Sequence, residues 1–208
     1  AENFGGVDFL INNAGRSIRR AIESSYDRFH DFERTMAINY FGALRITMGL
    51  LPGMVAKRRG HIVNISSISV LVNAPRFSSY VASKAALDAW TSCAACEFAD
   101  QGITFTSIKM PLVRTPMTAP TKIYESMPLL NPEEAADMII RACVERPVEI
   151  TTRLGTSVGL LHVAAPRVAQ ILMNTTFRMF PDSAAAKGEK GGEKKPSLSP
   201  EAIAMASM

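Results

Sequence analysis

The chain has few of the residues and runs on which several classes of protein depend. It contains three cysteines and three histidines in 208 residues, and no uninterrupted apolar run reaches the length of a membrane span. The nearest candidate, Leu154–Met173, is interrupted by Pro166 and Arg167, which makes it amphipathic. A small, odd number of cysteines is typical of free thiols in a reducing cytosol rather than of a disulfide framework. We therefore expect a cytoplasmic protein with no membrane-spanning helix.

The histidines, cysteines and charges argue against three further kinds of site. His30, His61 and His162 are isolated, without acidic or cysteine residues at ligand spacing, so we expect no metal site. Cys93 and Cys96 form a C-x-x-C inside a helical pattern, and we interpret them as structural. The net charge of +4 is modest and the basic residues are scattered, so we expect no nucleic-acid partner.

The sequence also lacks the start of a dinucleotide-binding fold. Such a fold opens with a strand, a glycine-rich turn and a helix whose amino terminus holds the pyrophosphate. No early segment of this chain has that pattern. Gly155–Gly159 is the one lookalike, but it has Leu161 in place of a third glycine, and we interpret it as structural.

Apolar periodicity predicts strands that alternate with helices. Short continuous apolar runs indicate buried strands, and apolar residues at every third or fourth position indicate helices. The predicted strands are Val7–Ile11, His61–Ile65, Ile103–Ile108 and Val148–Thr152, and the predicted helices are Asp31–Val55, Ser78–Ala99 and Glu133–Glu145. This alternation is typical of a parallel sheet with βαβ crossovers. We expect one domain over residues 1–182 and a flexible Gly/Lys/Glu-rich tail with a short helix over residues 183–208.

Local signals refine two of these helices. Pro52 predicts a disturbance near the end of the first helix. Asn131 can cap the last helix, Pro132 suits its first position, and Glu134 stands where a capping box needs it.

Tyr80 and Lys84 are the most informative pair of residues. They lie one turn apart in a predicted helix, so both side chains share one face. An ammonium within a few Å can lower the pKa of a phenol by roughly 1–3 units, which would make Tyr80 a usable general acid or base. Ser67 follows the strand His61–Ile65, and Asn39 lies in the first predicted helix.

Taken in this order, the polar motifs resemble those of the short-chain dehydrogenase/reductase family. The motifs are Asn12–Gly15, Asn39, Ser67, Tyr80, Lys84 and Met110–Thr115, over residues 7 to about 118. The resemblance implies a doubly wound α/β Rossmann fold with a parallel sheet, and NAD(P)H-dependent reduction of a carbonyl. Because the glycine-rich turn is missing, we expect the C-terminal portion of that fold, with the first mononucleotide-binding half absent and no activity of the chain alone.

The resemblance also implies a role for each matching residue. Tyr80 exchanges the proton with the substrate oxygen, and Ser67 orients the carbonyl. Lys84 lowers the tyrosine pKa and holds the nicotinamide ribose, and Asn39 supports a water that leads protons to Lys84. The residues implied to contact the cofactor are Asn13, Ala14, Gly15, Tyr80, Lys84 and Val113. Taken singly, Ser67 and Asn39 could also be ordinary structural hydrogen-bonding residues.

The last third of the chain points to a substrate class. Arg114–Tyr124, Thr151–Gly155, Ala165–Gln170 and Asn174–Ser183 resemble the carboxyl-terminal reductase domain of bacterial two-domain fatty acyl-CoA reductases. That resemblance implies a long-chain acyl-CoA or fatty aldehyde as substrate and NADPH as donor, with NADH as the alternative. An acyl channel would suit Met117, Ile123, Tyr124, Met127, Leu160, Leu161, Leu172, Met173, Phe177 and Met179, although these could equally be core or a subunit interface.

Two other functions stay open from the sequence. The chain could be a truncated, non-catalytic Rossmann-like fragment with a structural or interaction role, or it could reduce another carbonyl substrate. We expect a small-molecule partner and a homo-oligomer, and the chain could also contact a membrane peripherally.

Overall fold

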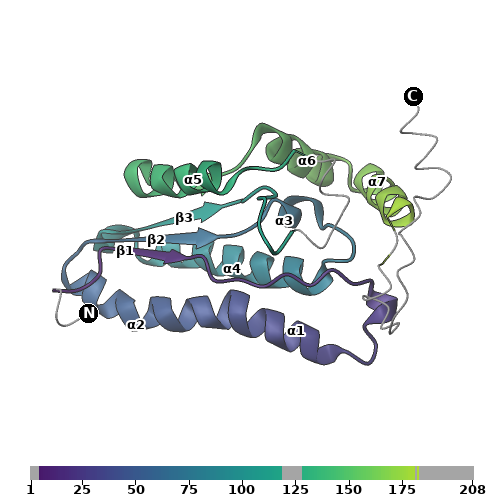
Figure 1. The fold of residues 1–208 in the computed structure, drawn as a ribbon. Helices are drawn as coiled ribbons and strands as arrows, with labels where there is room; N and C mark the ends of the chain where they lie inside the picture. Colours follow the sequence, from purple (N-terminus) through teal and green to yellow (C-terminus); the bar gives the residue numbers. More distant parts are fainter. Residues whose placement is uncertain (1–4, 119–127, 181, 183–208) are drawn as a thin grey trace.

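A four-stranded, all-parallel sheet lies at the centre of the molecule (Figure 1). The computed structural model describes residues 5–118, 128–180 and 182. The strands are β1 (Phe9–Asn12), β2 (Gly60–Ile65), β3 (Ile103–Ile108) and β4 (Glu149–Ile150), in the spatial order β1-β2-β3-β4. Neighbouring parallel strands require crossovers, which the helices supply. The α/β class predicted from the alternating pattern is confirmed.

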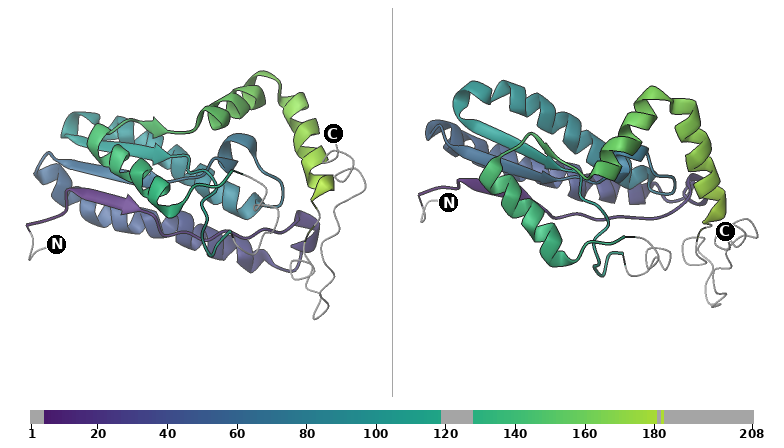
Figure 2. Two further views of the ribbon diagram at one scale, coloured as in Figure 1. Left: turned by 45° about the horizontal axis from the view of Figure 1, so that its top comes forward. Right: turned by 90° about the horizontal axis from the view of Figure 1, so that it is seen from above.

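Helices cover both faces of this sheet (Figures 1 and 2). The elements are η2 (Ile22–Ser24), α1 (Phe29–Met36), η3 (Ala37–Gly42), α2 (Ala43–Ala56), α3 (Ser69–Val72), α4 (Ser78–Glu97), η4 (Ala99–Gln101), α5 (Pro132–Glu145), α6 (Arg153–Ala164) and α7 (Pro166–Met179). The continuous helix α1-η3-α2 and α4 share one face, and α5 covers the other.

Alternate residues of each strand build a core on each face. Ile62 and Phe105 pack with Met54 of α2 and Ala94 of α4 on one side. Val63, Ile65, Ile108 and Ile150 pack with Ala142 of α5 on the other. Successive side chains of a strand point to opposite faces, so a fully buried β2 serves both cores.

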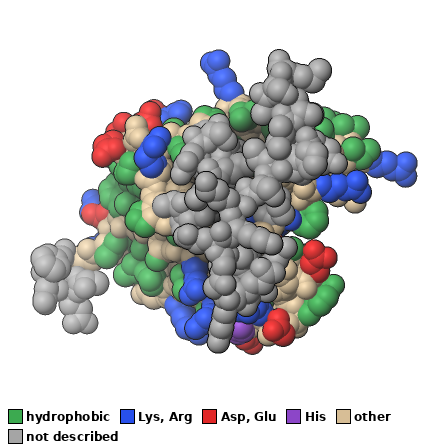
Figure 3. Space-filling view, turned by 45° about the vertical axis from the view of Figure 1, so that its right-hand side comes forward, with side chains coloured by type: hydrophobic (Ala, Val, Ile, Leu, Met, Phe, Trp, Pro, Cys, Tyr) green, Lys and Arg blue, Asp and Glu red, His purple; other side chains and the backbone are tan. Residues whose placement is uncertain are grey.

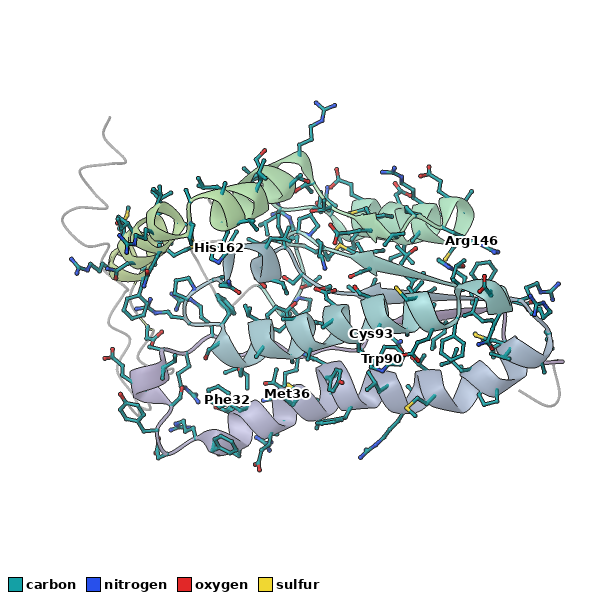
Figure 4. All side chains as sticks on the ribbon, turned by 180° about the vertical axis from the view of Figure 1, so that it is seen from behind. Phe32, Met36, Trp90, Cys93, Arg146 and His162 are labelled. Carbon is teal, nitrogen blue, oxygen red and sulfur yellow. The ribbon has the colours of Figure 1, made fainter. Side chains whose placement is uncertain are left out.

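The apolar face of α4 packs on the sheet. Leu87 is buried, and the Trp90 ring lies edge-on to Phe105 with ring centroids 6.2 Å apart. Cys93 lies one turn beyond Trp90 (Figure 4), but Cys93 and Cys96 are exposed, free thiols. They are therefore not core residues.

The first long helix is irregular at a different place from the one predicted. The helix continues through Pro52 to Ala56, and the irregularity is the π-helical segment Ala37–Gly42. Met48, whose carbonyl an N–H at position 52 would have met, is 61% exposed, so water can satisfy that carbonyl. The π segment contains Asn39, and such segments are frequent at functional sites.

Strand and helix ends follow local hydrogen bonds. Glu134 accepts a hydrogen bond from the Asn131 backbone, 2.7 Å, so the predicted capping box is confirmed. The predicted strand Val148–Thr152 shrinks to Glu149–Ile150 because the Thr152 side chain caps α6 instead, accepting from the Gly155 backbone at 3.1 Å.

The glycines Gly155 and Gly159 allow α6 to pack closely beside α3. A methyl group at Gly155 would lie 3.0 Å from Ile68 Cδ1, and one at Gly159 would lie 3.5 Å from Leu71 Cβ. The structural interpretation of this glycine pair is confirmed. Across the described ranges, no helix is both long and apolar enough to cross a membrane.

Candidate active site

The end of β2 meets one face of α4, and this contact brings three predicted site residues together. The Lys84 ammonium donates a hydrogen bond of 2.6 Å to the carbonyl oxygen of Ile65. Two residues further along, Ser67 lies beside the Tyr80 phenol, and its Oγ accepts hydrogen bonds from the backbone N–H and the hydroxyl of Ser69 at 3.2 and 2.9 Å. Ser67, Tyr80 and Lys84 are therefore adjacent, although their roles in a reaction stay a prediction.

Burial has the largest effect on the pKa of Tyr80. It raises the pKa of the Tyr80 phenol above its ordinary value, and the hydrogen bond with Ser67 lowers that pKa only in part. This direction is opposite to our prediction from the spacing of Tyr80 and Lys84. Desolvation of the phenol outweighs the other contributions, while the ammonium is engaged by the Ile65 carbonyl.

Lys84 is itself almost fully buried. Burial lowers the pKa of its ammonium to about 8, and the carboxylate of Asp88 acts in the opposite direction. The ammonium is therefore mostly charged at neutral pH, and it can stabilise a negative charge that develops close to it.

Asn39 connects the loop after β1 to α4. Its amide oxygen accepts the N–H of Arg16 at 2.8 Å, and its amide nitrogen donates to the Arg16 carbonyl and to Ser83 Oγ, both at 2.9 Å. A buried amide needs such partners. These contacts fit a structural hydrogen-bonding residue, and the water-supporting role stays a prediction.

Gly15 places the chain directly beside Lys84. A methyl group at Gly15 would lie 3.4 Å from Asn39 Oδ1 and 3.5 Å from Lys84 Nζ. The neighbouring Asn13 and Ala14 are exposed. The loop after β1 thus forms an accessible wall next to the Lys84 ammonium.

Asn12, the first residue of that motif, has a structural task. Its side-chain amide donates to Asn64 at 2.7 Å and to Thr47 at 3.0 Å, and Asn64 in turn donates to Thr91 at 2.7 Å. This buried chain of hydrogen bonds links β1, β2, α2 and α4.

Val113 lies on the segment that follows β3. Its carbonyl accepts a hydrogen bond from Thr118, 2.8 Å, and it forms an isolated parallel bridge with Leu130. Earlier on the same segment, the Met110 carbonyl accepts the N–H of Ile68 at 3.0 Å. Val113 therefore lies at the carboxyl edge of the sheet, but within the described part of the chain no contact joins it to Lys84.

Sequence reasoning missed a partly buried carboxylate on the same face of α4. Asp88 accepts hydrogen bonds from Ser66 and Ser107 and pairs with Lys109. Its position four residues after Lys84 is the signal that could have found it.

Only part of the predicted acyl channel falls within the described residues. Phe177 lines a cavity of about 600 Å³ between η2, the loop before α4 and α7. Met117, Leu160 and Leu172 are exposed, whereas Ile123, Tyr124 and Met127 lie outside the described residues. Within the described segments no cluster of His, Cys, Asp and Glu could hold a metal ion.

The arrangement can perform proton transfer at an oxygen atom. A phenol and a serine hydroxyl lie together at the carboxyl edge of a parallel sheet, with a buried ammonium one turn away on the same helix. Ligands of open α/β sheets bind in the crevice outside this edge.

Comparison with known proteins identifies the class to which this fold and site belong. Residues 1–125 match the family described as short chain dehydrogenase, so the chain belongs to the short-chain dehydrogenase/reductase family. It resembles a short-chain dehydrogenase from Streptomyces avermitilis with a TM-score of 0.69 and 26% identity, over 85% of this chain and 72% of that one. It also resembles a 4-hydroxyisoleucine dehydrogenase complexed with NADH and succinate, with a TM-score of 0.59 and 28% identity, over 67% of this chain and 61% of that one.

Two relatives share a more specific description. The chain is 60% identical over 184 residues to a fatty acyl-CoA reductase of Acinetobacter baylyi, which covers 88% of this chain and 62% of that protein. It is 47% identical over 173 residues to a fatty acyl-CoA reductase of Mycobacterium tuberculosis, which covers 83% of this chain and 59% of that protein. The chain thus spans about three fifths of the length of these relatives.

Proposed function

We propose that the chain carries the proton-transfer site of a reductase that acts on the carbonyl of a long-chain fatty acyl-CoA or fatty aldehyde, with NADPH as the donor. The observation that carries this proposal is the contact of Ser67 with Tyr80 at the end of β2, one turn from buried Lys84. The 60% identity to a fatty acyl-CoA reductase supports the substrate class.

In the proposed reaction the Tyr80 hydroxyl donates its proton to the carbonyl oxygen of the substrate. Its raised pKa keeps the phenol protonated at neutral pH, which suits a donor. Ser67 donates a hydrogen bond to the same oxygen, and the Lys84 ammonium stabilises the phenolate that remains. A bound nicotinamide would supply the hydride to the carbonyl carbon, so an aldehyde would leave as an alcohol. An acyl-CoA would leave as an aldehyde, with coenzyme A expelled as the thiolate and taking up the proton.

The residues beside Lys84 fit the nicotinamide end of such a cofactor. The absence of a side chain at Gly15 keeps the space next to Lys84 Nζ open, because a methyl group there would lie 3.5 Å from that atom. Asn13 and Ala14 belong to the same loop and are exposed. We assign the nicotinamide ribose to this place, with NADPH first and NADH as the alternative, and we keep Val113 as a backbone contact of the carboxamide.

We further propose that a preceding βαβ unit completes this sheet. Within the described residues, β1 pairs on one side only, with β2. Phe9 and Ile11 of this edge strand are 43% and 42% exposed, and a free apolar edge favours pairing with another strand. A preceding unit would also supply the pyrophosphate turn that the sequence shown does not contain.

The α6–α7 surface supports peripheral contact with an anionic membrane. Its exposed aliphatic residues are Leu154, Leu160, Val163, Val168, Ile171 and Leu172. Residues 153–180 include three arginines and no acidic residue, and all three arginines are exposed. Figure 3, turned toward the α7 side, shows hydrophobic and basic side chains next to each other. Amphipathic helices of this kind bind the headgroup region of anionic bilayers.

Contacts from the loop before α4 anchor α7 beside the proposed site. Arg76 donates hydrogen bonds to Asp182 at 2.7 Å and to the Phe177 carbonyl at 2.9 Å, and its guanidinium lies 3.9 Å from the centroid of the Phe177 ring. A membrane-facing α7 would therefore lie against the loop that leads into α4, the helix that contains Tyr80, which suits a lipid substrate.

We also propose a cytoplasmic location and a homo-oligomeric state. Exposed apolar residues on the outer side of the continuous helix α1-η3-α2 support the latter, and they are Ile38, Phe41, Ile46 and Met48.

Oxidation of NADPH, followed by its absorbance, tests the proposed function. The assay should use the polypeptide with its natural upstream sequence, with hexadecanal and hexadecanoyl-CoA as substrates. We expect turnover with both. A steady absorbance with both substrates, from protein that binds NADPH, would contradict the proposal.

A further inference from the structure

We propose that Asp88 is a positioning residue for Tyr80 and Lys84, acting through a hydrogen bond to Ser66 and through its negative charge. This proposal rests on the proposed function of Tyr80 and Lys84. Its observation is that three successive residues at the end of β2 contact three residues on one face of α4.

The three contacts are evenly spaced. Ser67 contacts Tyr80, the Ile65 carbonyl accepts from Lys84 at 2.6 Å, and Ser66 donates to Asp88 at 2.8 Å. Tyr80, Lys84 and Asp88 follow one another at intervals of four residues and therefore lie along one helical face. The side chains of Ser66 and Ser67 and the main-chain carbonyl of Ile65 thus contact one face of α4.

Asp88 contacts more groups than Ser66 alone. Its other carboxylate oxygen accepts from Ser107 at 2.5 Å, and Lys109 Nζ lies 2.6 Å from the oxygen bonded to Ser66. Lys109 is itself buried and lies 3.4 Å from Glu149 of β4. One carboxylate therefore joins α4 to β2 and β3, and through Lys109 to β4.

The charges around this carboxylate are unequal in number. Asp88 pairs with the buried ammonium of Lys109, and its negative charge also acts on the buried ammonium of Lys84. Tyr80 is neutral, and Glu149 is partly exposed. A buried charge needs a partner in a medium of low dielectric constant. Asp88 therefore helps to keep Lys84 charged, and Lys109 competes with Lys84 for the same carboxylate.

This competition predicts that two variants shift the pKa of Lys84 in opposite directions. Asp88→Asn keeps the side-chain shape and removes the charge, so the pKa of Lys84 should fall. Lys109→Met removes the competing ammonium and leaves Asp88 bonded to Ser66 and Ser107, so the pKa of Lys84 should rise. A merely structural Asp88 would behave differently, because loosening the site would hydrate Lys84 and raise its pKa in both variants.

The experiment is a pH titration of the Lys84 side-chain resonances in protein labelled with ¹³C-lysine, with Lys84→Arg to assign the signal. We expect the midpoint to fall by about one pH unit in Asp88→Asn and to rise in Lys109→Met. Glu97→Gln, at an exposed position of the same helix, is the matched control and should leave the midpoint unchanged.

An unchanged or raised midpoint in Asp88→Asn would overturn the proposal. If that variant does not fold, Lys109→Met still tests the charge on Lys84, because a midpoint that fails to rise overturns the proposal. The titration needs no turnover, so a failure of the proposed reductase activity would be seen separately, in the absorbance assay.

Discussion

The ammonium of Lys84 lies 2.6 Å from the main-chain carbonyl oxygen of Ile65. The lysine is thereby held at the end of β2, on the same helical face as Tyr80 and next to the loop that contains Gly15. We propose that a charge held by the backbone in this way stabilises the phenolate when Tyr80 gives up its proton. The following predictions test the consequences.

Tyr80→Phe should lower turnover by about 10²–10⁴-fold, because it removes only the hydroxyl that donates the proton. The dissociation constant of NADPH should stay nearly unchanged, since the ring remains in place. Steady-state kinetics and fluorescence titration of NADPH measure the two quantities. Tyr26→Phe, at a residue that is 84% exposed, is the control. Turnover of Tyr80→Phe close to that of the control would show that the proton comes from elsewhere.

Lys84→Met should change how stability depends on pH. Burial lowers the pKa of Lys84 from 10.5 to about 8, so the unfolded chain binds this proton more tightly between these values. The contribution of Lys84 to the free energy of unfolding is then least favourable below pH 8, and it rises with pH up to about 10.5.

The size of this effect follows from the shift in pKa. The difference in unfolding free energy between the natural protein and Lys84→Met should change by about 3 kcal/mol from pH 7 to pH 10.5, to the advantage of the natural protein. Urea denaturation at several pH values measures it. A difference that does not vary with pH would mean that Lys84 is not buried as described.

Longer acyl chains should be better substrates. Each buried methylene contributes about 0.8 kcal/mol, so kcat/KM should rise several-fold for each added pair of carbons until the binding surface is filled. Aldehydes and CoA thioesters of four, eight, twelve and sixteen carbons with NADPH give the profile. A flat profile would return the chain to a reductase of another carbonyl substrate.

Vesicle binding should depend on both the charge and the apolar residues of α6–α7. We expect the protein to sediment with vesicles containing phosphatidylglycerol at low salt, and much less at high salt or with vesicles of phosphatidylcholine alone. Val163→Glu and Ile171→Glu should each abolish sedimentation. Val144→Glu, at a 75% exposed position of α5, is the matched control. An equal loss of sedimentation in all three variants would show that α6–α7 is not the membrane-contacting surface.

The affinity for NADPH should depend on a preceding βαβ unit. The chain of residues 1–208 should bind NADPH weakly in calorimetry, because the pyrophosphate contacts would come from that unit. Addition of the natural upstream sequence should bring the dissociation constant into the micromolar range. Micromolar affinity of residues 1–208 alone would refute the proposed division of the site.

Much of the fold could be predicted from the sequence. The strands around Ile62 and Phe105 are rich in β-branched and apolar residues, and the start of α5 at Asn131 is a complete capping box. Such signals are local, because they depend on neighbours within one turn or one strand. The spacing of Tyr80 and Lys84 is equally local, so the prediction of the helix was enough to place both side chains on one face.

The tertiary structure decided everything that depends on burial and on partners distant in sequence. It showed that desolvation raises the pKa of Tyr80, whereas the spacing to Lys84 had indicated the opposite direction. It also placed Asn39 against Arg16 and set Asp88 against Lys109. A sequence gives the separation of two residues along a helix, but the water removed around a group and the charges brought to it from other strands exist only once those strands have packed.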